Sequence, residues 1–135
     1  MNYAVIDVET TGLNPNIHEI IEVAIVTKDE SYHAKVIPMN IEHASPKALE
    51  INGYNEKDWY GAVPAKDVAI RTAKMLDGKT IIGHNPSFDM SFLRELCRCL
   101  KQLKYLTDLL NFLLVSNKVN TRCRDNLLNQ LLHVP

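Results

Sequence analysis

The order of strand-like and helix-like segments is the feature that most restricts the fold of this chain. Three segments rich in Val and Ile, as β-strands are, come first, at residues 3–8, 20–28 and 32–37. From residue 45 onward, segments with helical periodicity alternate with short strand-like ones. Strands followed by alternating strands and helices are typical of an α/β fold with a mixed sheet.

Turn and cap residues set the expected boundaries of these elements. The short turn at residues 28–31 predicts that the second and third strands form an antiparallel hairpin. Prolines at first helical positions predict the starts of three helices. The expected elements after residue 45 are helices at 46–51, at 64–76 and from 86 onward, strands at 80–83 and 104–106, and two leucine-rich helices, one after Thr107 and one around 127–132.

Composition limits the class of protein. The chain has 135 residues, of which 46% are hydrophobic and 23% charged, so we expect one globular domain over residues 1–135. A net charge of -1 argues against a strongly basic nucleic-acid-binding surface, but not against an enzyme that handles nucleic acid through bound cations. Three cysteines, no secretory leader and no apolar stretch long enough to cross a bilayer predict a cytoplasmic protein with reduced thiols and no membrane association.

Two carboxylates end the first predicted strand. Asp7 and Glu9 are two positions apart, so both side chains project from the same face of a strand. Carboxylates held close together repel each other unless a positive charge lies between them. Mg²⁺ or Mn²⁺, which prefer oxygen ligands, are the expected partners of this pair.

A third carboxylate follows the fourth predicted strand. Asp89 lies in the first turn of a helix, just after Gly83-His84-Asn85. If the fourth strand lies beside the first, Asp89 reaches the same edge of the sheet as Asp7 and Glu9. This arrangement predicts a site for two Mg²⁺ or Mn²⁺ ions, about 4 Å apart, that hold the attacking and leaving oxygens of a phosphodiester.

Three stretches of the sequence resemble the DEDD-type 3′–5′ exonucleases, the relatives of polymerase proofreading subunits and of ribonuclease T. Residues 7–13 (DVETTGL) with 19–24 (EIIEVA) resemble the first motif, and residues 83–85 (GHN) with Phe88 and Asp89 resemble the second. Residues 48–54 (ALEINGY) resemble the helix and turn near the terminal nucleotide of the substrate. The resemblance implies a ribonuclease H-like fold with a mixed five-stranded sheet flanked by helices.

The same resemblance implies roles for individual residues. Asp7 would bridge both cations, while Glu9 and Asp89 would each complete one metal site. The backbone around Thr10, Thr11 and Gly12 would hold the 3′-terminal nucleotide of single-stranded DNA or RNA, and Leu13 would press against its base, near Asn52. The reaction would release nucleoside monophosphates, and a polymerase or another protein could be a partner.

The family's third motif, a His and an Asp separated by four residues on a C-terminal helix, has two possible interpretations here. In one, residues 120–125 are a degenerate third motif, with Asn120, which cannot accept a proton near neutral pH, in place of the histidine. In the other, Asp125 caps a packing helix and the third motif lies beyond Pro135, so the chain is truncated. The alternative to an active exonuclease is therefore an impaired domain that binds nucleic acid or a protein partner.

Two other groups of residues are expected to have ordinary structural roles. Trp59 and Tyr60 could stack on a nucleic-acid base, but packing of their loop against the domain is the preferred interpretation. His18, His33 and His43 lie in predicted loops or in the hairpin and are expected to be solvated.

Overall fold

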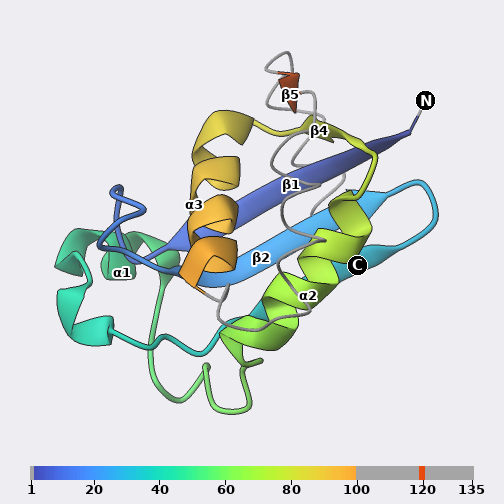
Figure 1. Ribbon diagram of the computed structural model, residues 1–135. Helices are drawn as coiled ribbons and strands as arrows, with labels where there is room; N and C mark the ends of the chain where they lie inside the picture. Colours follow the sequence, from blue (N-terminus) through green and yellow to red (C-terminus); the bar gives the residue numbers. More distant parts are fainter. Residues whose placement is uncertain (1, 100–118, 121–135) are drawn as a thin grey trace.

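The computed structural model describes residues 2–99 and 119–120, and its centre is a five-stranded sheet with the order β3-β2-β1-β4-β5 (Figure 1). The strands are β1 (Tyr3–Thr10), β2 (Ile20–Thr27), β3 (Ser31–Lys35), β4 (Thr80–Ile82) and β5 (Val119–Asn120). The helices are η1 (Ile41–His43), α1 (Pro46–Asn52), α2 (Ala65–Leu76) and α3 (Pro86–Cys99).

The sheet is mixed, as the sequence predicts. β1 pairs with β2, and β2 with β3, in antiparallel fashion, which confirms the predicted hairpin. β1 and β4 are parallel, and so are β4 and β5. The fifth strand differs from the expectation, because Val119–Asn120 pairs with β4, whereas the expected strand at 104–106 lies outside the described residues.

The two faces of the sheet have different characters. α2 and α3 lie across one face (Figure 1), where alternate residues of β1 and β2 contribute to the apolar core. Because side chains alternate along a strand, Asp7 and Glu9 project from the opposite face. The strand residues in the core are Ala4, Ile6, Val8, Ile20, Val23, Ile25, Ala34 and Ile81.

The described helices include none that is both long and apolar enough to cross a membrane.

β1 extends beyond the end of its parallel neighbour. The last pair between these strands joins Val5 to Ile82, so β1 continues for five residues with no β4 beside it. The chain leaves β4 at Gly83, where an added Cβ would lie 3.2 Å from the carbonyl oxygen of Ile6. The absence of a side chain at Gly83 therefore lets the chain pass close to β1 on its way to α3.

Candidate functional site

Asp89 is buried beside the end of β1. Its side chain comes from the first turn of α3, and the residue is only 5% exposed. The Oδ1 atom of Asp89 accepts a hydrogen bond of 2.9 Å from the backbone N–H of Val8. Since β4 ends before it reaches this position, a carboxylate rather than a strand satisfies the amide of Val8.

This bond brings Asp89 to the residue between Asp7 and Glu9, and the three carboxylates affect one another. Burial is the main cause that raises the pKa of Asp89, to about 7; the hydrogen bond from Val8 lowers it, and the charges of Asp7 and Glu9 raise it further. Burial also raises the pKa of Glu9, with a further contribution from Asp7. The expectation that Asp89 reaches the same edge as the first pair thus agrees with the structure.

Glu22 is a fourth acidic residue near this edge, to which the motif resemblance assigns no role. Glu22 lies directly opposite Glu9 in the register of β1 and β2, and its charge also raises the pKa of Glu9. Its Oε1 atom is paired with the Nε2 atom of His33 on β3. The side chain of His33 is 64% exposed, so it is solvated, as expected, and also makes this contact. The cross-strand register, which needs the correct pairing of β1 and β2, is the signal that could have found Glu22.

The donor chemistry of this edge suits a hard divalent cation. Asp7, Glu9 and Asp89 supply carboxylate oxygens, and their mutual repulsion is of the kind that a bound cation relieves. Within residues 2–99 and 119–120, however, no three His, Cys, Asp or Glu side chains form a group arranged to hold a metal ion. In this conformation Asp89 Oδ1 is bonded to Val8. The role of the three carboxylates as ligands therefore stays a prediction.

The turn after β1 is held by its two threonines. Thr11 is buried, and its hydroxyl accepts a hydrogen bond of 2.9 Å from the N–H of Glu19. The N–H of Thr11 donates to the carbonyl of Glu19 (2.8 Å), and its own carbonyl accepts from the N–H of Ser45 (2.7 Å). Thr10, also buried, donates from its hydroxyl to the carbonyl of Gly12 (2.6 Å). Both hydroxyls are thus used within the protein, where they shape the turn.

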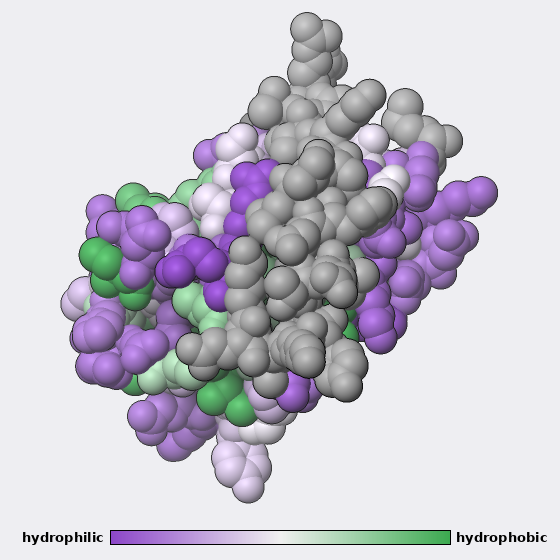
Figure 2. Space-filling model, in the orientation of Figure 1, coloured by the Kyte–Doolittle hydropathy of each residue, from purple (hydrophilic) through white to green (hydrophobic). Residues whose placement is uncertain are grey.

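Asn52 connects α1 to this turn. Its side-chain amide donates a hydrogen bond of 2.7 Å to the carbonyl of Thr10, the last residue of β1. Two large apolar side chains near this connection face the solvent: Leu13 is 84% exposed and Ile51 is 73% exposed. Figure 2 shows hydrophobic surface among hydrophilic residues on the side where α1 and the loop after β1 lie in Figure 1. Exposed apolar side chains of this kind are available for contact with a ligand.

Gly12 is required by the packing of a histidine. An added Cβ at Gly12 would lie 2.5 Å from ring atoms of His18. The Nδ1 atom of His18 also accepts a hydrogen bond of 3.0 Å from the N–H of Asn14. His18, which was expected to be solvated, is therefore only partly exposed, because one side of its ring packs against the loop between β1 and β2.

Trp59 packs against the domain, as expected. It is 7% exposed, and its indole N–H donates a hydrogen bond of 2.9 Å to the carbonyl of Ile21. The ring of Tyr54 lies 4.9 Å from that of Trp59, and Lys35 Nζ lies 4.1 Å from its centroid. Trp59 is therefore not available to stack on a base, whereas the neighbouring Tyr60 is almost fully exposed.

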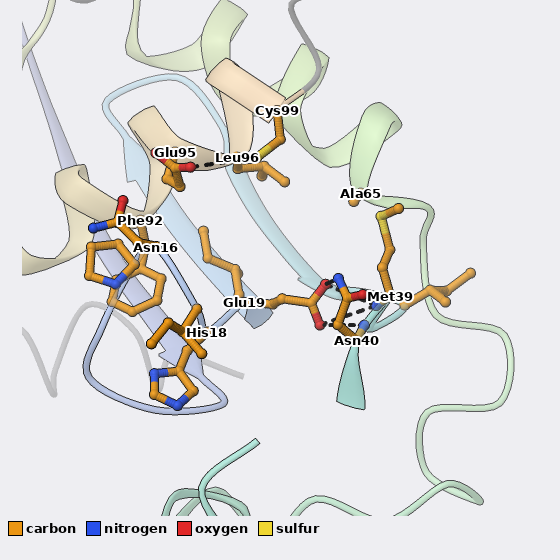
Figure 3. A pocket seen from close by; sticks show the side chains of 14 residues that line it. Asn16, His18, Glu19, Met39, Asn40, Ala65, Phe92, Glu95, Leu96 and Cys99 are labelled. Atoms are coloured by element: carbon orange, nitrogen blue, oxygen red, sulfur yellow. Dashed lines mark hydrogen bonds between the residues drawn. The ribbon is translucent and has the colours of Figure 1, made fainter. Parts of the chain in front are cut away.

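A pocket of about 210 Å³ lies behind the turn, between the loop after β1 and the C-terminal half of α3 (Figure 3). Phe92 and Leu96 of α3 form part of its wall, and Met39 and Ile17 are among the apolar residues around it. The carboxylate of Glu19 lies at the pocket wall, bonded to Met39 and Asn40.

Comparison with known proteins places the chain in a class of nucleases. The RNase_T family model, described as exonuclease, matches residues 4–134. The chain therefore belongs to the exonuclease family that this model defines.

Individual relatives agree with this assignment. DNA polymerase III PolC-type of Thermotoga maritima is 32% identical in an alignment 97 positions long, which covers 68% of this chain and 7% of that protein. Ribonuclease T of Klebsiella pneumoniae is 32% identical in an alignment 108 positions long, which covers 65% of this chain and 50% of that protein. The chain thus spans about half the length of this ribonuclease T and a small part of the polymerase.

A solved structure shares the fold. Exonuclease I of E. coli, solved in complex with a dT13 oligonucleotide, superimposes with a TM-score of 0.65 at 19% identity, over 72% of this chain and 23% of that chain. At this identity the similarity supports the ribonuclease H-like architecture of the sheet and its helices, and not the details of the site.

Proposed function

We propose that this chain is a 3′–5′ exonuclease domain, dependent on Mg²⁺ or Mn²⁺, that removes nucleoside monophosphates from single-stranded DNA or RNA ends. The observation that carries the proposal is the position of Asp89, bonded to Val8 between Asp7 and Glu9. Membership of the exonuclease family supports the reaction class. The cytoplasmic location expected from the sequence stays a prediction.

The three carboxylates are the proposed catalytic and metal-binding residues. Asp7, Glu9 and Asp89 would hold the cations, which would supply a nucleophile at neutral pH and stabilise the charge that develops on the phosphodiester. Asp89 must give up its proton before it can bind a cation, because its pKa lies near 7. The Val8 amide fixes the direction of the Asp89 carboxylate before any cation binds.

The 3′-terminal nucleotide would lie at the end of β1. Leu13 and Ile51 present apolar surface there, and Asn52 holds α1 against Thr10. Because both threonine hydroxyls and the backbone N–H and carbonyl of Thr11 are used internally, contacts to the nucleotide would come from the remaining backbone groups of Thr10 and Gly12. The oligonucleotide bound by exonuclease I and the polymerase context of the PolC relative support a single-stranded substrate and a polymerase partner.

The test compares two variants that lose the same charge. Asp7→Asn and Asp29→Asn, the latter in the turn between β2 and β3, are incubated with 5′-labelled single-stranded DNA or RNA and Mn²⁺. We expect the wild type and Asp29→Asn to shorten the strand from its 3′ end. Asp7→Asn should be slower by about 100-fold or more, since it removes a metal-ligand charge. An intact strand that remains bound to the wild type would instead support the impaired, binding domain.

A further inference from the structure

The carboxylate of Glu19 accepts hydrogen bonds from the backbone of two residues, Met39 and Asn40, and from one side-chain amide. The N–H of Met39 donates to both of its oxygens, at 3.0 Å and 3.2 Å. The N–H of Asn40 donates to Oε2 at 2.9 Å, and the Asn40 side-chain amide donates to Oε1 at 3.3 Å (Figure 3). Hydrogen bonds from backbone amides to a charged acceptor are among the stronger ones in proteins. The side chain of Glu19 therefore joins Met39 and Asn40, the two residues before η1, to the start of β2.

The backbone of Glu19 extends the connection to the proposed 3′-nucleotide site. Its N–H and its carbonyl are both bonded to Thr11, two residues after Glu9. The carbonyl of Thr11 is in turn bonded to Ser45, the residue before α1. Glu19 thus joins the segment that leads into α1 to the turn that leads out of β1.

This connection fixes two surfaces relative to each other. The turn after β1 carries Leu13, and α1 carries Ile51 and Asn52. The bond from Asn52 to Thr10 anchors the end of α1, while Glu19 anchors the segment before it. The side chain of Glu19 lies at the wall of the pocket and not in the apolar core, so its removal leaves core packing in place.

We infer that Glu19 is a positioning residue for the 3′-terminal nucleotide: through Met39 and Asn40 it holds α1 at the correct distance from the carboxylate-bearing end of β1. The inference rests on the proposed exonuclease function. Glu19 does not contact the reacting atoms, so its effect falls on substrate binding rather than on the chemical step.

The experiment uses Glu19→Gln in the full 135-residue chain. Glutamine keeps the size of the side chain but replaces one acceptor oxygen with a donor that faces backbone N–H groups. The matched control is Glu95→Gln, on the α3 wall of the same pocket, where the Glu95 carboxylate accepts hydrogen bonds from Arg98 and Cys99. With a 5′-labelled oligo(dT) nonamer and Mn²⁺, we expect KM to rise about 10-fold in Glu19→Gln, the effect of one lost charged hydrogen bond, with kcat changed by less than about two-fold.

A second variant and a second measurement separate positioning from misfolding. Asn40→Ala removes the 3.3 Å bond and keeps the backbone ones, so its KM should change by less than about three-fold. Hydrogen exchange of peptides that cover 46–54 should be faster in Glu19→Gln than in Glu95→Gln, whereas those that cover α2 should not change. Fluorescence of Trp59 verifies that each variant is folded.

The possible outcomes decide the inference. An active wild type with an unchanged KM in Glu19→Gln, or an equal rise in both Gln variants, overturns this inference and leaves the proposed function intact. A fall in kcat at constant KM also overturns it. A wild type that degrades no strand overturns the proposed function, and the inference with it.

Discussion

The Oδ1 atom of Asp89 lies 2.9 Å from the backbone nitrogen of Val8, so a helix residue satisfies an amide of the strand that carries Asp7 and Glu9. The same short contact places three carboxylates within reach of one another's charge. Stability and cation binding should therefore both depend on the protonation of Asp89.

Asp89→Asn should change how stability depends on pH. The pKa of Asp89 is raised to about 7 from its ordinary value of 3.8, mainly by burial. The folded protein holds the proton of Asp89 more tightly than the unfolded chain does. Proton binding at Asp89 therefore adds its full share to the free energy of unfolding below about pH 4, and this share is lost as the pH rises to about 7. Asparagine has no charge to bury and still accepts from Val8. In EDTA, the free energy of unfolding of Asp89→Asn should increase relative to that of the wild type as pH rises, by on the order of a few kcal/mol.

Urea unfolding followed by the fluorescence of Trp59, the single tryptophan, measures this difference between pH 4 and pH 8. A parallel series on Asp29→Asn controls for the general effect of charge. If the two variants keep a constant stability difference across this range, Asp89 does not carry the raised pKa.

Mn²⁺ should stabilise the folded protein more at pH 8 than at pH 5. A cation that binds only the folded state raises the free energy of unfolding by about 2.7 kcal/mol at 100 times its Kd. At pH 5 the proton on Asp89 competes with the cation, because the pKa of this group is about 7. Thermal unfolding with and without 1 mM Mn²⁺ tests this at both pH values. Equal stabilisation at both would show that the cation does not bind at Asp89.

Gly83→Ala should destabilise the protein and disturb the site together. The added methyl group would lie 3.2 Å from the carbonyl oxygen of Ile6, so the end of β4 has to move away from β1. We expect a loss of about 1–2 kcal/mol in the free energy of unfolding. The control is Ser87→Ala, at an exposed position in the first turn of α3. A Gly83→Ala variant as stable as the control would mean that the close approach is not needed.

Leu13→Ala should affect substrate binding and not stability. Leu13 is 84% exposed, so its truncation should change the free energy of unfolding by less than about 0.5 kcal/mol. If Leu13 contacts the terminal base, KM for a single strand should rise roughly 3- to 10-fold. Ile37→Ala, at another exposed apolar position, is the comparison. Similar KM values for the two variants would argue against a role for Leu13.

Most of the fold could be predicted from local patterns. β1 was expected at 3–8 and continues to Thr10, because the chain keeps pairing with β2 across the irregular register at Glu9 and Thr10. The helix from residue 64 to 76 is observed as Ala65–Leu76, since Pro64 sets its start and its apolar face packs in the core. The strand Val119–Asn120 could not be predicted, because two residues are too few to show a periodic pattern.

Three acidic residues of the candidate site could be predicted, but its hydrogen bonds could not. Asp7 and Glu9 lie near the end of β1 and Asp89 lies in the helix after β4, so the order of the strands determines that they come together. The partners of Glu19, Asn52 and Thr11 depend on how loops fold back on β1, which no local pattern encodes. Glu22 is near Glu9 only through the register of two strands.

The bond between Val8 and Asp89 joins residues that are 81 positions apart in the chain. The acidic cluster therefore does not exist in an unfolded or partly folded polypeptide, unlike a site made from one short loop. Divalent ions should therefore leave the rates of the early refolding steps unchanged. They should instead slow unfolding, because α3 cannot leave the sheet without breaking up the acidic cluster.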